Sequence, residues 1–296
     1  MRTYSQIAGD GGSDVAGQIA ELGAAIARRL ASVRHRVAIG SGKGGVGKST
    51  LTRQLAAVLS AAGRRVGILD ADLNGPSQAL LGGVRGTPPL PGENGLVVPR
   101  SRDGVRILSA GSVLGDGAAL AWPGAEAGHQ HVWRATREFA SLAELLAAVD
   151  WGPLDVLLVD LPPGPERTAQ FADFLGPATD VVLVTVPSAL ARGVVARSLD
   201  ALRALPNRRL GYVENMSGYA CRGCATVRPL FPEDSETASL GLACLGRVPF
   251  DPELARLCDR GVAVTEMAAS DGPASPVLAA LRDVATELMN RLEESR

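Results

Sequence analysis

The chain has 296 residues, of which 46% are hydrophobic, 21% charged and 4% aromatic, which suits one large or two small globular domains with a buried core. Thirty basic and 31 acidic residues give a net charge of −1, so no overall field draws the protein to nucleic acid or to anionic lipid. No apolar run reaches the about 18 residues of a membrane span, and no signal peptide is evident, so we expect a soluble cytoplasmic protein without nucleic-acid or membrane partners.

The first 35 residues are expected to form a mobile tail and one helix. Residues 1–14 are polar and glycine-rich, which is typical of a tail. Apolar residues then recur at helical spacing, and a short helix without bulky aromatic side chains is expected to pack on its own domain rather than on a membrane. The apolar positions are Ile19, Leu22, Ile26, Leu30 and Val33.

From residue 36 onward, short runs rich in Val, Ile and Leu alternate with longer helical stretches. Runs with little polar alternation predict strands that are buried on both faces, and the helical stretches between them predict right-handed crossovers. Residues 36–296 are therefore expected to form one three-layer α/β domain with a mostly parallel sheet of about seven strands. Ligands of such sheets bind beyond the carboxyl ends of the strands. The predicted strands are residues 36–40, 65–70, 105–109, 155–160, 180–186, 209–215 and 244–248.

The segment from Gly111 to Arg137 has poor periodicity and scattered glycines, so we expect it to form a long surface loop. His129 and His131 lie in this segment. Two loop histidines without nearby cysteines or carboxylates favour exposure to solvent over metal binding.

A phosphate-binding loop is predicted directly after the first strand, at residues 41–50. Gly42, Gly47, Lys48 and Ser49 fit the P-loop pattern, in which glycines let backbone N–H groups surround phosphate oxygens. The N-terminus of the next helix adds positive charge, Lys48 is expected to contact the phosphates, and the Ser49 hydroxyl is expected to bind Mg²⁺. A nucleoside triphosphate is therefore the expected ligand. Its expected contacts are Gly42, Lys43, Gly44, Gly45, Val46, Gly47, Lys48, Ser49 and Thr50.

Only two of the 30 basic residues are lysines, and both, Lys43 and Lys48, lie in this loop. A chain that uses arginine almost everywhere else keeps a compact ammonium where a planar guanidinium does not fit, so we infer that both positions are chemically constrained. The string GKGGVGKST is similar to the deviant Walker A motif of the MinD/ParA/nitrogenase-iron-protein class. This resemblance implies that Lys43 reaches the phosphates bound by a second copy of the chain, so that hydrolysis depends on dimerisation.

Carboxylates follow two of the predicted strands. Asp160 ends the run at 155–160 and is placed like a Walker B acid, which holds a Mg²⁺-bound water. Asp72 follows the run at 65–70 and is placed to orient or activate the attacking water, whereas Asp70 is expected to be structural. The alternative for Asp72 and Asp160 is an N-cap or a turn aspartate.

Asn215 ends the predicted strand at 209–215 and offers both a donor and an acceptor, as the edge of adenine requires. The guanine-reading pattern Asn-Lys-x-Asp is absent. The sequence therefore favours ATP over GTP, the alternative being that Asn215 only caps a turn.

A cysteine pair, Cys221 and Cys224, lies just beyond Asn215. In a chain of this length with four cysteines, such a close pair indicates a metal or redox site rather than a disulfide framework. A 4Fe–4S cluster usually takes four thiolates, so two chains with one pair each would complete the set. Cys244 and Cys258 fall in a predicted strand and a predicted helix, and we expect them to be buried, inert thiols.

Four longer motifs carry a family resemblance. They are DADLNGPS at 70–77, DLPPG at 160–164, VENMS at 213–217 with the cysteine pair after it, and LGRVPFDPELARLCDRG at 245–261. Together they resemble the Mrp/ApbC family of ATP-binding iron–sulfur cluster carriers over about residues 36–292. The resemblance implies a P-loop NTPase domain in a cytosolic homodimer that binds a 4Fe–4S cluster through Cys221 and Cys224. It also implies slow hydrolysis of ATP with Mg²⁺, and transfer of the cluster to apo iron–sulfur proteins together with the cluster assembly machinery.

The chain departs from the family pattern at three places. Arg222 and Gly223 separate the two cysteines, where the family usually carries a proline. Residues 165–167 are Pro-Glu-Arg after DLPPG, where the family has Thr-Gly-Asp, and residues 186–188 are Val-Pro-Ser in place of Thr-Pro-Gln. These departures bear on cluster affinity and on the loop that senses the γ-phosphate.

Two other functions fit parts of the sequence. A MinD/ParA-like positioning or regulatory switch would use the cysteine pair for zinc or leave it without a role. A membrane-binding C-terminal helix is not indicated, because apolar positions with mixed charges between them predict a core helix. A redox dithiol would lie at a helix N-terminus, whereas this pair follows a strand. The apolar positions of the C-terminal helix are Leu278, Leu281, Val284, Leu288 and Leu292.

Overall fold

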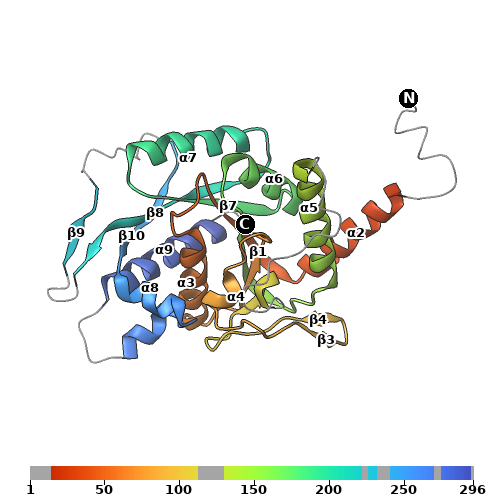
Figure 1. Cartoon of the computed structure of the whole chain (residues 1–296), viewed down its shortest axis with the longest axis horizontal. Helices are drawn as coiled ribbons and strands as arrows, with labels where there is room; N and C mark the ends of the chain where they lie inside the picture. The colour runs from red at the N-terminus through yellow and green to blue at the C-terminus, as the bar shows by residue number, and fades with distance from the viewer. Residues whose placement is uncertain (1–14, 113–129, 222–225, 232–240, 270–274, 295–296) are drawn as a thin grey trace.

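Seven parallel strands form the centre of the molecule, in the order β10-β8-β7-β1-β6-β2-β5 (Figure 1). The structure is a computed structural model and describes residues 15–112, 130–221, 226–231, 241–269 and 275–294. Each of the predicted strands is present, which confirms the three-layer α/β fold. The strands are β1 (Val33–Ser41), β2 (Val66–Asp70), β5 (Arg106–Leu108), β6 (Leu154–Asp160), β7 (Thr179–Thr185), β8 (Arg209–Ala220) and β10 (Cys244–Phe250).

Helices cover both faces of the sheet, and each face has its own hydrophobic core (Figure 1). Because successive side chains of a strand point to opposite faces, β1 places Val37 and Ile39 in one core and Ala38 in the other. The first core is covered by α3 (Lys48–Ala61), α4 (Gln78–Leu81), α8 (Pro252–Asp259), the 3₁₀ helix η3 (Val264–Ala269) and α9 (Pro276–Glu293). The second is covered by α2 (Val15–Leu30), α5 (Gln130–Ala148), α6 (Pro165–Leu175) and α7 (Ala189–Leu202).

Short elements lie outside this main arrangement. β9 (Val227–Pro229) runs antiparallel to β8 and stands at the outer edge of the molecule (Figure 1). β3 (Leu90–Gly92) and β4 (Gly95–Val97) form a separate hairpin, and η1 (Ala110–Ser112) is a single 3₁₀ turn. The sequence did not predict them, because three residues are too few to establish a periodicity.

The segment interpreted as a long surface loop is partly helical, which corrects that prediction. α5 begins at Gln130 and includes His131, whereas His129 lies outside the residues that the structure describes. The scattered glycines before the helix obscured its start. Further along, Leu142 and Leu146 recur one helical turn apart and are fully buried in the second core.

The N-terminal helix packs on its own domain, as predicted. The Arg29 side chain donates a hydrogen bond from Nε to the carbonyl of Ala147 in α5 at 3.0 Å. The prediction that Val33 belongs to this helix is wrong, because α2 ends at Leu30 and Val33 is the first residue of β1. β1 therefore crosses the expected boundary between residues 35 and 36, and the expected tail, residues 1–14, lies outside the described part of the chain.

The C-terminal segment forms the predicted core helix, α9. All of its predicted apolar positions are buried, and the helix packs against α3, β8 and β10. None of the helices in the described ranges combines the length and the apolar character that crossing a bilayer requires.

Gly261 and Gly63 offer a matched test of a close backbone contact. Both follow a helix with a left-handed backbone, at φ of 67° and 81°. A Cβ on Gly261 would lie 2.6 Å from the Cα of Gly83, whereas a Cβ on Gly63 would have no heavy atom within 4 Å. We expect Gly63→Ala to lower the free energy of unfolding by about 1–2 kcal/mol and Gly261→Ala to lower it by about 2–5 kcal/mol, because overpacking adds to backbone strain. Urea unfolding measures both losses, and equal losses would contradict the close contact.

Candidate nucleotide site and cysteine motif

The P-loop lies between the end of β1 and the start of α3, as predicted. Gly45 and Gly47 have φ of 78° and 77°, in the left-handed region that favours glycine. Packing also requires a glycine at 47, because a Cβ there would lie 2.3 Å from Nδ2 of Asn215. That Nδ2 donates a hydrogen bond to the Val46 carbonyl at 2.8 Å, so Asn215 contacts the loop directly. The other expected contacts lie in the loop (Gly42, Lys43 and Gly44) or in the first turn of α3 (Lys48, Ser49 and Thr50).

The lysine of the P-loop and the acid at the end of β6 form a buried ion pair. Lys48 Nζ donates to Asp160 Oδ1, and the two side chains are 7% and 0% exposed. Lys48 Nζ also donates to the Ser49 hydroxyl at 3.3 Å, so three of the predicted site residues meet at one point. A charge this deeply buried needs a partner of opposite sign. A phosphate that enters the loop therefore competes with Asp160 for Lys48.

Asp70 lies opposite Asp160 in the register of β2 and β6. Its Oδ2 accepts hydrogen bonds from the backbone N–H groups of Ser77 and Gln78, both at 2.9 Å, and from the Ser109 hydroxyl at 2.8 Å. These bonds fit the expected structural role, since they tie the chain after β2 to the strand end. Burial, and then the nearby charge of Asp160, raise the pKa of Asp70 to about 7.

Asp72 and Lys43 lie at the same end of the sheet and are half-buried. Asp72 Oδ1 accepts a hydrogen bond from the Gly75 N–H at 3.2 Å, which is the turn interaction that the sequence left open as an alternative. Within the described residues, the Lys43 ammonium makes no hydrogen bond and no ion pair. The catalytic roles of both residues stay predictions.

Gln78, the first residue of α4, is a site residue that the sequence reasoning missed. Its Nε2 donates to Asp160 Oδ2 at 2.8 Å and to the Ser49 carbonyl at 3.0 Å, and its side chain is fully buried. The sequence offered one signal that Gln78 belongs to the site, which is that it directly follows the DADLNGPS motif at 70–77.

A second missed cluster joins the loop that follows β2 to helices α5 and α6. Glu138 on α5 is buried and accepts hydrogen bonds from Asn74 Nδ2, at 2.5 Å, and from Arg167 Nη2. The Arg167 guanidinium also lies over the rings of Phe139 and Phe171, 5.6 and 5.0 Å from their centroids. Arg167 belongs to the first turn of α6, so its bond to Glu138 connects α6 to α5.

Cys221 follows β8 directly, next to the last residue of β8 that pairs with β9, which confirms that the cysteine motif follows a strand. Its N–H donates a hydrogen bond to the Thr226 carbonyl at 2.9 Å. Cys224 lies in that segment, outside the described part of the chain. No group of three or more His, Cys, Asp or Glu side chains suited to a metal ion occurs among the residues described.

The other two cysteines differ from each other in exposure. Cys258 is buried, accepts a hydrogen bond from Gln54 Nε2 at 3.3 Å, and has a thiol pKa raised by burial, which confirms the predicted inert thiol. The prediction that Cys244 is buried is wrong. Cys244 is the first residue of β10, the strand at the edge of the sheet, and it is exposed. It pairs in register with Tyr212, and at about 3.3 Å per residue the strand separates it from Cys221 by roughly 30 Å.

Comparison with known families gives a clear match. A family model described as a ParA-type NUBPL iron-transfer P-loop NTPase matches residues 32–289. The chain belongs to this family. It is 32% identical over 248 residues to the iron-sulfur cluster carrier protein of Methanocaldococcus jannaschii, covering 82% of each chain. It is also 37% identical over 270 residues to the cytosolic Fe-S cluster assembly factor NUBP2 of Bos taurus, covering 88% of this chain and 94% of the relative.

Solved structures agree with this assignment to the NUBPL family. A nucleotide-binding protein from Archaeoglobus fulgidus, solved with ADP, matches with a TM-score of 0.68 and 29% identity, over 86% of this chain and 98% of that one. The cell division ATPase MinD of Pyrococcus furiosus matches with a TM-score of 0.60 and 24% identity, over 87% of this chain and 99% of that one, a likeness of fold alone. The nucleotide-binding P-loop fold and the predicted family resemblance are both confirmed.

The raised pKa of Asp70 predicts that the free energy of unfolding depends on pH. In the folded, nucleotide-free protein Asp70 keeps its proton up to a pH of about 7, whereas the ordinary pKa of 3.8 applies to the unfolded chain. Between these values the folded state holds an extra proton, so its stability falls as the pH rises through this window.

Asp70→Asn has no such proton to lose. Its free energy of unfolding relative to the wild type should therefore rise between about pH 5 and about pH 8, by an amount on the order of a few kcal/mol. Urea unfolding of both proteins at the two pH values measures the change. A difference that stays constant with pH would show that the pKa of Asp70 is not raised.

Proposed function

We propose that this protein binds an iron–sulfur cluster between two copies of the chain and transfers it to apo-proteins in a cycle of slow ATP hydrolysis. The observation that carries this proposal is the course of β8. The strand brings Asn215 to the P-loop and, six residues later, leads into the cysteine motif at Cys221. The names of two relatives, an iron-sulfur cluster carrier protein and a cytosolic Fe-S cluster assembly factor, support the cargo and a cytoplasmic location.

The cluster is the cargo, and one chain supplies half of its usual ligand set. Cys221 and Cys224 from each of two copies would provide the four thiolates of a 4Fe–4S cluster across a symmetric dimer. The positions of the remaining cysteines support this assignment. Cys258 is enclosed in the protein interior, and Cys244 lies at the opposite end of the strand pair.

Exposed apolar side chains gather around the same end of the sheet. Tyr219, Val227, Leu230 and Phe250 are between 37% and 47% exposed, and strand pairing places Tyr219 beside Phe250. Apolar surface that is grouped in this way is typical of a contact face. It supports a dimer contact at the cysteine end of the molecule.

The P-loop side of the site fits ATP with Mg²⁺. The Ser49 hydroxyl and the buried Asp160 carboxylate are hard oxygen ligands of the kind that Mg²⁺ prefers, directly or through water. When bound, the metal would neutralise charge on the phosphates. Lys48 would exchange Asp160 for a phosphate, Asp72 would orient the attacking water, and Lys43 would reach the nucleotide of the second copy.

Cys221→Ala is expected to abolish cluster binding, because it removes two of the four thiolates of the dimer. After anaerobic reconstitution, the wild type should be brown and contain about one 4Fe–4S cluster per two chains. Iron and sulfide analysis together with the absorption spectrum measures this. Cys244→Ala is the matched control, and it should keep the cluster because its thiol lies at the far end of β10. A colourless wild type would overturn the proposal.

Lys43→Ala is expected to bind ATP like the wild type and to hydrolyse it roughly 10³-fold more slowly, because a cation supplied to the transition state is removed. Calorimetry and phosphate release measure the two effects. Lys48→Ala should instead lose ATP binding.

Mixing two inactive variants tests whether Lys43 acts across the dimer. In a mixed dimer of Lys43→Ala and Asp72→Ala, one site would combine an intact Asp72 with the Lys43 of the other copy. Hydrolysis should therefore recover in part on mixing. Normal hydrolysis by Lys43→Ala alone, or no recovery on mixing, would contradict the trans-acting lysine.

A further inference from the structure

Gln78 connects the two strand-end carboxylates to the P-loop. Its backbone N–H donates to Asp70 Oδ2 at 2.9 Å. Its Nε2 donates to Asp160 Oδ2 at 2.8 Å and to the Ser49 carbonyl at 3.0 Å. The side chain is 0% exposed, so these hydrogen bonds lie in the interior of the site.

One atom of this amide has no partner. A carboxylate and a carbonyl can only accept hydrogen bonds, so the NH₂ group of Gln78 must face Asp160 and Ser49, and Oε1 must be the remaining atom. Within the described residues, Oε1 is buried and accepts no hydrogen bond. Buried polar atoms are rarely left unpaired, so this oxygen points to a ligand that donates a hydrogen bond.

The contacts of Asp160 indicate which kind of ligand fits there. Its Oδ1 is occupied by Lys48, which the phosphates would attract, and its Oδ2 is occupied by Gln78. Lys48 and Gln78 thus bond to different oxygens of Asp160, and Gln78 also donates to the Ser49 carbonyl. Mg²⁺ keeps several bound water molecules in nucleotide sites, and these waters are hydrogen-bond donors.

We propose that Gln78 is a positioning residue of the Mg²⁺–nucleotide site. Its Nε2 holds Asp160 and Ser49 at a fixed separation, and its Oε1 accepts a hydrogen bond from a water molecule of the bound Mg²⁺. Groups that orient metal ligands in this way change metal affinity when they are removed. The inference rests on the proposed binding of a nucleotide with Mg²⁺ and adds a residue to that site.

Gln78→Met tests this role, because it keeps the length of the side chain and removes both polar atoms. The measurement is binding of fluorescent ADP to the whole protein, in EDTA and in a titration with MgCl₂. The affinity of each variant in EDTA serves as its own reference, because Gln78 also bonds to the Ser49 carbonyl in the phosphate loop. The Mg²⁺ concentration that gives half of the gain in affinity should rise roughly tenfold or more.

Two further variants separate positioning from stability. Gln54→Met removes another fully buried amide, which bonds to Cys258 and to the Val264 N–H and not to the phosphate site. It should lower the free energy of unfolding and leave the Mg²⁺ response unchanged. If Gln78→Met does not fold, Gln78→Asn keeps the amide but shortens its reach, and it should shift the Mg²⁺ response in the same direction.

The outcomes are distinguishable. A wild-type Mg²⁺ response in a folded Gln78 variant that still binds ADP would overturn the role of Gln78 and leave the proposed function intact. A wild type that binds no nucleotide, or whose binding does not respond to Mg²⁺, would overturn the proposed Mg²⁺–nucleotide site and the role of Gln78 with it.

Discussion

The ion pair between Lys48 and Asp160 joins the P-loop to the end of β6 in the dry interior of the site. The parallel register of β1 and β6 places Ile39 opposite Asp160, so the loop that starts two residues later passes beside the carboxylate. Losing one partner of a buried ion pair typically costs about 3–5 kcal/mol, because the other charge is left without compensation. A phosphate that takes Lys48 therefore leaves Asp160 in need of a new cation. This is a physical reason for a divalent metal and a nucleotide to enter the site together.

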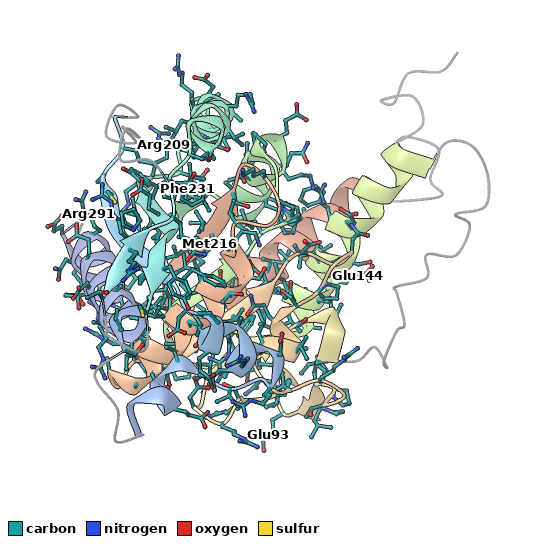
Figure 2. All side chains as sticks on the ribbon, turned by 60° about the vertical axis from the view of Figure 1, so that its left-hand side comes forward. Glu93, Glu144, Arg209, Met216, Phe231 and Arg291 are labelled. Carbon is teal, nitrogen blue, oxygen red and sulfur yellow. The ribbon has the colours of Figure 1, made fainter. Side chains whose placement is uncertain are left out.

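β8 is the second feature on which the proposed function depends, because it contacts the nucleotide loop and ends at the cysteine motif. Met216 has a φ of 54°, rare for a residue with a side chain, and the pairing of β8 with β10 is irregular in the same stretch. Met216 and Phe231, both labelled in Figure 2, pack against the core on the P-loop side of the sheet. The strand is thus irregular at Met216, the residue next to Asn215, whose amide contacts the P-loop.

The loops after β2 and β6 are held by a third set of contacts, which centre on Glu138. A buried carboxylate that accepts from both Asn74 and Arg167 makes the positions of the two loops depend on each other. Asn74 lies two residues from Asp72, and Arg167 lies in the first turn of α6, three residues beyond Gly164. The Glu138 carboxylate therefore links the chain after β2 to the start of α6.

The sequence by itself determined the strands, the P-loop and the family, because each of these depends on a local pattern. Continuous apolar runs indicate strands that are buried on both faces of a sheet, and a glycine-rich loop with this spacing between a strand and a helix indicates a phosphate-binding loop. The start of α5 did not follow from such a pattern, because scattered glycines precede the helix. The exposure of Cys244 did not follow either, because Cys244 is the first residue of β10, the strand at the edge of the sheet.

Only the tertiary structure decided which polar side chains meet. Gln78 and Asp160 are 82 residues apart, Asn74 and Glu138 are 64 apart, and Asn215 and Val46 are 169 apart. Such contacts are fixed by the register of parallel strands and by the packing of helices on them. Periodicity along the chain shows which faces are buried, but not which residues of distant elements lie opposite each other. The residues of the motifs were therefore predictable, whereas the partners that orient them were not.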